Sequence, residues 1–200
     1  MNREKIGDAQ FKKIVSDHAA AAAVAALAAA VPLVGTAVAN FVAFGFICTM
    51  YVRLANYLEF SMSKGFIRAL ATSVISQIAA VTVARIAVGT VLSLIPGFGT
   101  VGAIVLTGAT VYASTIVAAE IFKRIIVLMM DSDKDISSYT EEDLSHMVEE
   151  SMSKDELKTC YKAATDEYKE KKDSGELDKC DKVEMMDEFK EDPKQDPKSN

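Results

Sequence analysis

The sequence predicts an all-α protein: two apolar helical hairpins inserted in a membrane, followed by a short, soluble, acidic α-helical region. Three observations predict this fold. Residues 19–52 and 86–119 contain no charged side chain, a proline–glycine turn interrupts each run, and the charge changes sign after residue 130. Uncharged helices on both sides of such a turn are typical of hairpins that lie in lipid.

The two turns resemble each other. Residues 31–39 and 95–103 align without a gap at a Pro, a Gly, a Thr and a final Ala. The turn residues are Pro32, Gly35, Pro96, Gly97 and Gly99. Both turns lie midway along apolar runs of similar length, which indicates two hairpins of one design, residues 18–60 and 64–130, within a membrane domain of residues 18–130.

Residues 1–17 precede this domain and alternate apolar and charged side chains, as in an amphipathic segment. The four predicted helices cover residues 19–31, 36–52, 66–94 and 100–119. The first would be only about 20 Å long, which favours a wedge that stops inside the bilayer. The fourth is long enough to span it. Wedges and full spans therefore remain alternatives.

Lysine and arginine occur before the first helix, between the second and third helices and after the fourth, and neither turn contains any. Under the positive-inside rule both hairpins enter from the cytoplasmic side. We therefore expect a bacterial inner-membrane protein with both termini in the cytoplasm.

The C-terminal part differs in composition. Residues 1–130 hold ten bases and five acids, whereas residues 131–200 hold 12 bases and 23 acids. Thr140 and Ser153 each precede an acidic residue by three positions, the pattern of a helix-capping box. Two apolar stripes follow them: Leu144, Met147, Val148 and Met152, then Leu157, Cys160, Tyr161, Ala164 and Tyr168. The pattern predicts two helices in residues 131–190 that dock a partner, and a disordered tail, residues 191–200.

Small residues four positions apart indicate close helix packing in lipid, and thus self-association into a homo-oligomer. The pairs are Gly99 with Ala103 and Ala109 with Ala113. Three polar residues interrupt the apolar helices: Arg85, Asn40 and Gln77. Arg85 has either a functional role inside the membrane or a place in a polar groove between helices. Asn40 and Gln77 are interpreted as interhelical hydrogen-bonding residues.

A calcium site is a weaker candidate. Asp131, Asp133, Asp135 and Glu142 occupy positions one, three, five and twelve of an EF-hand loop. However, Ile136 stands at the sixth position, where the turn requires glycine. The pattern therefore favours an acidic linker.

The segment Gly97-x-Gly99-x-x-Gly102 matches the dinucleotide-binding fingerprint, but Pro96 precedes it and an apolar helix follows. Without a preceding strand and further βαβ units, the glycines indicate a hairpin turn. The sequence contains no catalytic motif, and the spacing of its two His and three Cys fits no zinc site. The acidic C-terminal part argues against nucleic-acid binding. We expect no enzymatic activity and no cofactor.

The residues around His18, the first proline turn, Met50-Tyr51-Val52-Arg53 and Ile95-Pro96-Gly97-Phe98-Gly99-Thr100 resemble those of a known family, domain of unknown function 697. This is a helical membrane-associated domain often fused to, or encoded beside, Era-like GTPases in bacteria. The resemblance covers about residues 18–126. It implies a membrane-associated helical fold and a GTPase as a possible partner. Members often carry an acid after the first proline turn, whereas this chain has Val34-Gly35-Thr36.

The leading hypothesis is an integral membrane protein that anchors or scaffolds a partner such as a GTPase, or shapes the bilayer. One alternative is a pore formed by oligomerised hairpins, with Arg85 facing the lumen. Another is a soluble α-bundle that binds an apolar ligand.

Overall fold

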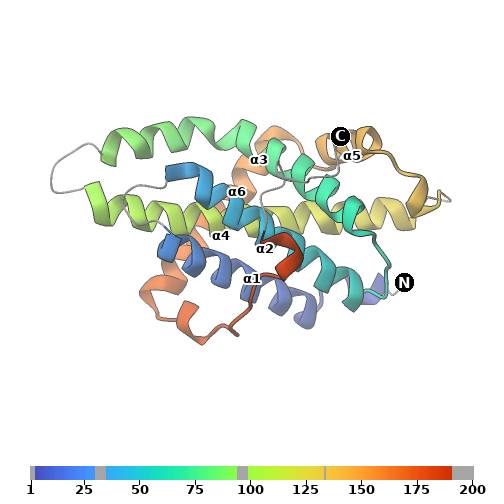
Figure 1. Cartoon of the computed structure of the whole chain (residues 1–200), viewed down its shortest axis with the longest axis horizontal. Helices are drawn as coiled ribbons and strands as arrows, with labels where there is room; N and C mark the ends of the chain where they lie inside the picture. Colours follow the sequence, from blue (N-terminus) through green and yellow to red (C-terminus); the bar gives the residue numbers. More distant parts are fainter. Residues whose placement is uncertain (1–2, 30–34, 94–98, 133, 191–200) are drawn as a thin grey trace.

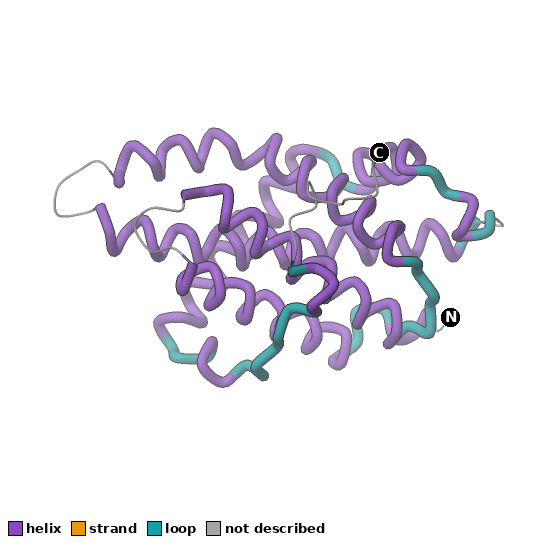
Figure 2. Tube along the Cα trace, in the orientation of Figure 1, coloured by secondary structure: helices purple, strands orange, loops and turns teal. Residues whose placement is uncertain are grey.

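The computed structural model describes residues 3–29, 35–93, 99–132 and 134–190, without the side chains of residues 29, 35–41, 81–93, 99–105 and 137. Over these ranges the protein is helical and has no strand, which confirms the all-α prediction (Figure 2). The α-helices are α1 (Ala9–Ala29), α2 (Gly35–Tyr57), α3 (Lys64–Ser93), α4 (Gly99–Met130), α5 (Glu141–Ser151) and α6 (Lys154–Asp173). Four short 3-10 helices lie between or beside them: η1 (Arg3–Lys5), η2 (Ile136–Ser138), η3 (Leu177–Lys179) and η4 (Asp187–Phe189).

Helix α4 lies at the centre and contacts each of the other five α-helices. Helices α1 to α4 run along the long axis of the molecule, each antiparallel to the next in sequence (Figure 1). Helix α5 packs mainly on α3, and α6 packs mainly on α4. The two hairpins therefore form one bundle, and the C-terminal helices cover one part of it.

Local capping explains several helix ends. The Asp8 carboxylate accepts a hydrogen bond from the Phe11 N–H at 2.8 Å and so caps α1. The capping boxes predicted at Thr140 and Ser153 are both present, with Asp143 and Glu156 as the reciprocal partners. Both predicted C-terminal helices are thereby confirmed.

Two predicted boundaries were wrong. Residues 1–17 are not a separate amphipathic segment, because α1 starts at Ala9 and continues into the alanine-rich stretch. Phe11 and Val15 are buried in the same core as the hairpins. Helix α4 also continues past the predicted end at residue 119, because Phe122 and Ile125 stay fully buried while the charged Lys123 lies at the surface side of the helix.

The C-terminal helices share one hydrophobic core with the hairpins. Leu144, Val148, Leu157 and Tyr161 from the predicted stripes are buried in the cluster that also contains Phe122. The apolar stripes therefore pack on the chain's own bundle.

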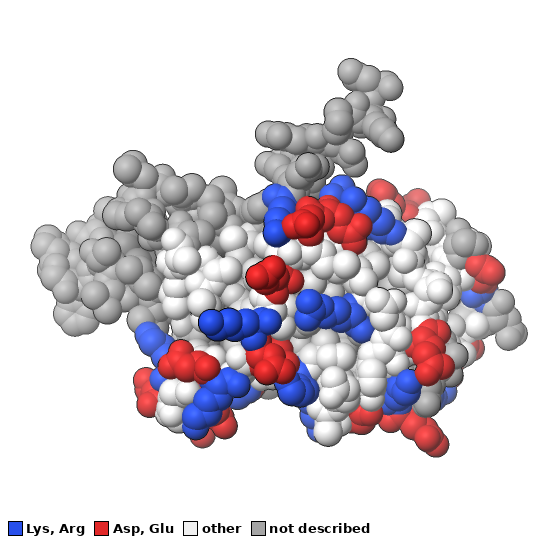
Figure 3. Space-filling model, turned by 60° about the horizontal axis from the view of Figure 1, so that its bottom comes forward, with Lys and Arg blue, Asp and Glu red and all other residues white. Residues whose placement is uncertain are grey.

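The basic part and the acidic part of the sequence form ion pairs with each other in the fold. Ion pairs join bases of the first part to acids of the second: Arg3 to Asp131, Lys13 to Asp181, Lys64 to Glu188 and Arg124 to Glu156. Figure 3 shows acidic and basic side chains interspersed on the face it presents. The basic body and the acidic region are thus neighbours rather than separate surfaces.

Within the described ranges, no helix combines the length and the hydropathy needed to cross a bilayer. The span predicted at residues 100–119 lies in α4, and the side chains at its start, residues 99–105, are outside the described part. The prediction of a transmembrane helix is therefore not supported by the residues that the structure describes.

Candidate functional site at the apolar end of the bundle

One end of the bundle brings together the end of α1, the start of α2, the end of α3 and the start of α4 (Figure 1). The ends of α3 and α4 project beyond those of α1 and α2. The described residues of this end are 24–29, 35–42, 86–93 and 99–107, and none of them is charged. We call it the apolar end.

Most of the site residues predicted from the sequence cannot be placed. Pro32, Pro96 and Gly97 lie outside the described residues. The remaining ones are in helices whose side chains at those positions are not described: Gly35, Asn40, Arg85, Gly99 and Ala103.

The described packing near this end uses small residues. Ala109 and Ala113, one of the two predicted pairs, are buried in α4. Ala109 shares a cluster with Ala19 and Ala23 of α1. The small residues therefore bring α1 close to α4 within one chain, where the sequence analysis expected contacts between chains.

Helix α6 approaches α4 closely at Gly108. A Cβ atom on Gly108 would overlap the hydroxyl oxygen of Tyr168 and lie 3.1 Å from Leu27 Cδ2 of α1. The Tyr168 hydroxyl is buried and has no hydrogen-bond partner in the described part of the chain. A side chain at position 108 would therefore force Tyr168 or Leu27 to shift, so Gly108 allows a close approach of α6 and α1 to α4.

A polar network lies one turn further along α4. The Tyr112 hydroxyl donates to Glu167 at 2.9 Å and accepts from Lys171 Nζ at 3.2 Å, and Lys171 also donates to Ser16 of α1 at 3.1 Å. Burial, together with the nearby Glu167 carboxylate, raises the pKa of Tyr112 to about 12. The phenol therefore stays protonated, and the network joins α1, α4 and α6 without acid–base activity near neutral pH.

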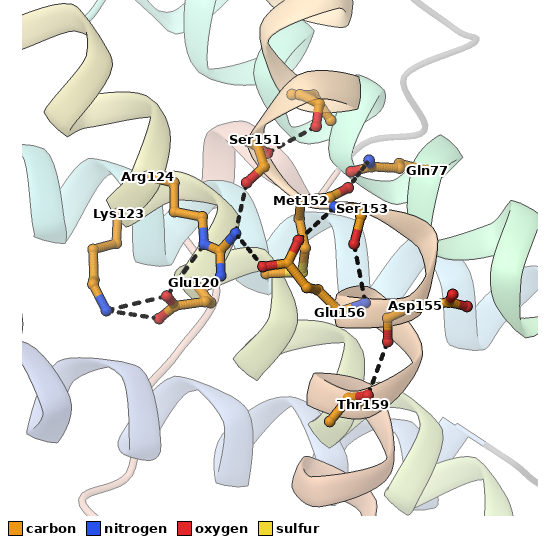
Figure 4. Close-up of polar contacts among 11 residues, drawn as sticks. Gln77, Glu120, Lys123, Arg124, Ser151, Met152, Ser153, Asp155, Glu156 and Thr159 are labelled. Carbon is orange, nitrogen blue, oxygen red and sulfur yellow. Dashed lines mark hydrogen bonds and ion pairs between the residues drawn. The ribbon is translucent and has the colours of Figure 1, made fainter.

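A second network fixes the turn between α5 and α6 to α4 (Figure 4). The Arg124 guanidinium donates to the Ser151 carbonyl at 2.7 Å and lies 3.4 Å from Glu156 and 3.5 Å from Glu120. Lys123 pairs with the same Glu120 at 3.0 Å. Figure 4 shows these side chains converging between α4 and the α5–α6 turn.

Gln77 contributes to the same junction from α3. Its Nε2 donates to the Met152 carbonyl at 3.3 Å, while its Oε1 is buried without a described partner. Gln77, predicted to form an interhelical hydrogen bond, here joins α3 to the α5–α6 turn.

A polar groove of about 550 Å³ lies between α1, Arg53 of α2 and residues 181–183. His18 lines it, and His18 Nδ1 donates to the Ile14 carbonyl at 2.6 Å. Its Nε2 is buried without a described partner. Burial lowers the pKa of His18 to about 4, so the ring is neutral near neutral pH. A neutral histidine fixed in one tautomer is a hydrogen-bond acceptor, but the groove provides no neighbouring nucleophile among the residues described.

The calcium candidates do not assemble into a described site. Asp131 forms an ion pair with Arg3 at 2.7 Å, and Asp133 is outside the described residues. Glu142 lies in the first turn of α5. Among the residues described, no three His, Cys, Asp or Glu side chains are grouped so that they could hold a metal ion.

The sequence analysis assigned residues 180–190 to the C-terminal region and predicted no packing role for them. Phe189 is fully buried, and Met185 packs against Gly45 in the middle of α2. The available signal was the apolar spacing of Val183, Met186 and Phe189, which is three residues each time.

Searches with family models, among curated proteins and among solved structures found no match to this chain.

Proposed function

We propose that this protein is a non-enzymatic membrane anchor whose apolar end enters the cytoplasmic leaflet of a bilayer as a wedge. Helices α5 and α6 then stay in water at the membrane surface. The sequence leaves two alternatives open, a wedge and a full span, and the proposal is the wedge.

The contact of α6 with α4 favours the wedge over the full span. From Gly108, where Tyr168 touches it, to Arg124, where Glu156 pairs with it, α4 has α6 at its side. The end of α6 nearest the apolar end exposes Lys169, Glu170 and Lys172. Charged side chains are costly in hydrocarbon, so this part of α4 is kept out of it while α6 is bound.

The rest of α4 before Gly108, residues 99–107, has the length of a wedge. At about 1.5 Å per residue it reaches about 14 Å. This matches one leaflet, since the hydrocarbon core is about 30 Å thick. The lysines at the end of α6 would then lie at the level of the lipid phosphates, where their long side chains are favoured.

A full span, or a pore made of spans, would require α6 to leave α4. That would expose Leu157, Tyr161 and Ala164, which are buried against the bundle. The wedge keeps these residues buried, and it is therefore the function that the described packing supports best.

The role at the membrane follows from the resemblance and the exposed charges. The outer face of α5 exposes Glu141, Glu142, Glu149 and Glu150, a surface suited to a basic partner. We propose anchoring or scaffolding of a cytoplasmic protein, with a GTPase as the partner that the resemblance implies, and self-association through the apolar ends.

The depth of the apolar end can be measured with tryptophan, because the sequence contains none. Phe98→Trp places a fluorophore in the second turn that the sequence predicts, residues 95–103. Leu128→Trp places the matched control near the other end of α4, where Leu128 is 48% exposed. Each variant is mixed with vesicles whose lipids carry bromine atoms at shallow or deep positions of one acyl chain. We expect deep bromines to quench the Phe98→Trp variant, and bromine at neither depth to quench the Leu128→Trp variant.

Quenching of the Phe98→Trp variant by shallow bromines only would indicate a turn at a headgroup, as in a full span. Absence of quenching at both depths would show that the apolar end does not enter lipid. Either result would contradict the wedge.

A further inference from the structure

The polar groove beside α1 is lined by two bases that form no ion pair within the described part of the chain. Its volume of about 550 Å³ is in the range of sites for small molecules. Arg53 of α2 and Lys182 line it, and both side chains are exposed. Neither makes a side-chain hydrogen bond to another described residue. The positive charges of both bases can therefore be used by a ligand.

The acids of the groove, in contrast, are already paired. The carboxylates of Asp17 and Asp181 both contact Lys13 Nζ, at 2.7 and 2.5 Å. The Asp181 N–H also donates to the Asp17 carboxylate at 3.3 Å. These contacts hold the start of residues 181–183 against α1, and Lys182 follows directly in the chain. With three bases and two acids among its lining residues, the groove has a net charge of +1.

His18 adds a hydrogen-bond acceptor to the groove. Its side chain is 1% exposed, and its Nδ1 donates to the Ile14 carbonyl at 2.6 Å. Burial and, to a smaller extent, the Arg53 guanidinium lower the pKa of His18 to about 4, so the ring is neutral and lies near Arg53. Its lone pair is on Nε2, which is buried and has no partner among the residues described. Because a buried acceptor without a partner costs free energy, a ligand that donates to Nε2 is favoured.

A ligand that satisfies all of these groups is an anion that also carries a hydrogen-bond donor. Carboxylates and sulfate have no proton near neutral pH. Inorganic phosphate keeps at least one, and phosphate monoesters are still partly protonated there, since their second pKa is about 6. Phosphate oxygens also match the planar, forked donors of a guanidinium, which can bind two of them at once.

We propose that this groove binds a water-soluble phosphate, either inorganic phosphate or a small phosphate monoester. Arg53 binds two of the oxygens, Lys182 pairs with the remaining charge, and His18 Nε2 accepts the hydrogen bond of the P–OH group. His18 lies about 16 Å along α1 from Ala29, which is at the apolar end. The site is therefore on the water side of the proposed wedge, and it does not depend on that function.

Titration of the full chain with inorganic phosphate tests the site, and sulfate is the matched anion without a proton. The ring nitrogens are followed by ¹⁵N NMR, because the chain has only two histidines and His146 of α5 serves as the internal reference. We expect phosphate to shift the His18 Nε2 signal until it saturates, and to leave His146 unchanged. Sulfate should bind at least about tenfold more weakly at equal ionic strength, since it leaves Nε2 without a donor.

Three variants separate specific binding from general attraction of anions. Arg53→Gln should weaken phosphate binding about tenfold or more, because a charge-assisted contact is lost. Lys12→Gln is the matched control, since it removes the same charge from an exposed position of α1 outside the groove, and it should bind like wild type. In His18→Leu, phosphate and sulfate should bind with similar affinity, because the acceptor that distinguishes them is gone.

Several results would overturn the phosphate site. One is a phosphate titration without a saturable shift of the His18 signal. Others are equal affinities of the wild-type chain for phosphate and sulfate, equal losses in Arg53→Gln and Lys12→Gln, or unchanged selectivity in His18→Leu. None of these results bears on the quenching of the Phe98→Trp variant, which tests the wedge separately.

Discussion

Helix α4 passes through two different environments. Near the apolar end it packs through small residues, where Ala109 meets Ala19 and Ala23 of α1. In its second half, Phe122 stacks on Tyr51 of α2 with ring centres 4.6 Å apart, and the Tyr51 hydroxyl donates to the Ala118 carbonyl at 2.9 Å. The part of α4 around Ala109 is thus held by its close approach to α1. Its second half is held by buried aromatic side chains.

The largest expected effect therefore belongs to the second half of α4. Phe122→Ala should lower the free energy of unfolding by about 4 kcal/mol, because it removes a fully buried ring from the core that α4 shares with α2. Leu128→Ala on the same helix is the control, and it should stay within about 0.5 kcal/mol because Leu128 is half exposed. Urea unfolding followed by circular dichroism measures both. Similar losses for the two variants would show that burial of the Phe122 ring is not what stabilises this half.

The next largest loss of stability is expected at Gly108, between the two parts of α4. Gly108→Ala should cost about 1–3 kcal/mol, because the added methyl group overlaps the Tyr168 hydroxyl and pushes α6 away from α4. Tyr168→Phe removes this oxygen, which has no described partner, and should itself be neutral or stabilising. Combined with Gly108→Ala, it should restore most of the loss. Purely additive free energies in this double-mutant cycle would show that the two side chains do not meet.

The smallest expected effect is a pH dependence of the free energy of unfolding that comes from His18. The buried His18 has its pKa lowered from 6.5 to about 4 mainly by burial, so the unfolded chain binds its proton first as the pH falls. Stability from this group is complete above about pH 6.5 and is lost between there and about pH 4. From about pH 7 to about pH 5 the loss should be about 2 kcal/mol.

His18→Leu removes the titrating group, and the difference between the two pH values should shrink by that amount. Urea unfolding at both values measures it. An unchanged pH dependence in the variant would place the responsible group elsewhere.

Local patterns predicted the helices well where caps and periodicity coincide. The boxes at Thr140 and Ser153 marked the starts of α5 and α6, and the stripe from Leu157 to Tyr168 named the buried face of α6. These signals extend over four to eight residues, within which the backbone and its own side chains decide the conformation. The start of α1 was less clear, because a charged surface on one side of a helix reads like a separate amphipathic segment.

The packing of residues 180–190 on α2 could not be predicted in this way. Nothing near Phe189 in the sequence indicates that the start of α3 and Gly45 of α2 form its binding surface. Likewise, the net positive and net negative parts of the chain suggested two separate surfaces. In the fold, however, Lys13 lies beside Asp181.

The sequence by itself determined that the chain is helical, where its two uncharged runs lie, and which faces of α5 and α6 are apolar, because periodicity, capping and hydropathy are properties of neighbouring residues. Only the tertiary structure decided what those faces contact, where α6 lies on α4 and where residues 180–190 pack. These depend on residues far apart in the chain, such as Tyr168 and Gly108, and on the space that a missing side chain leaves between them.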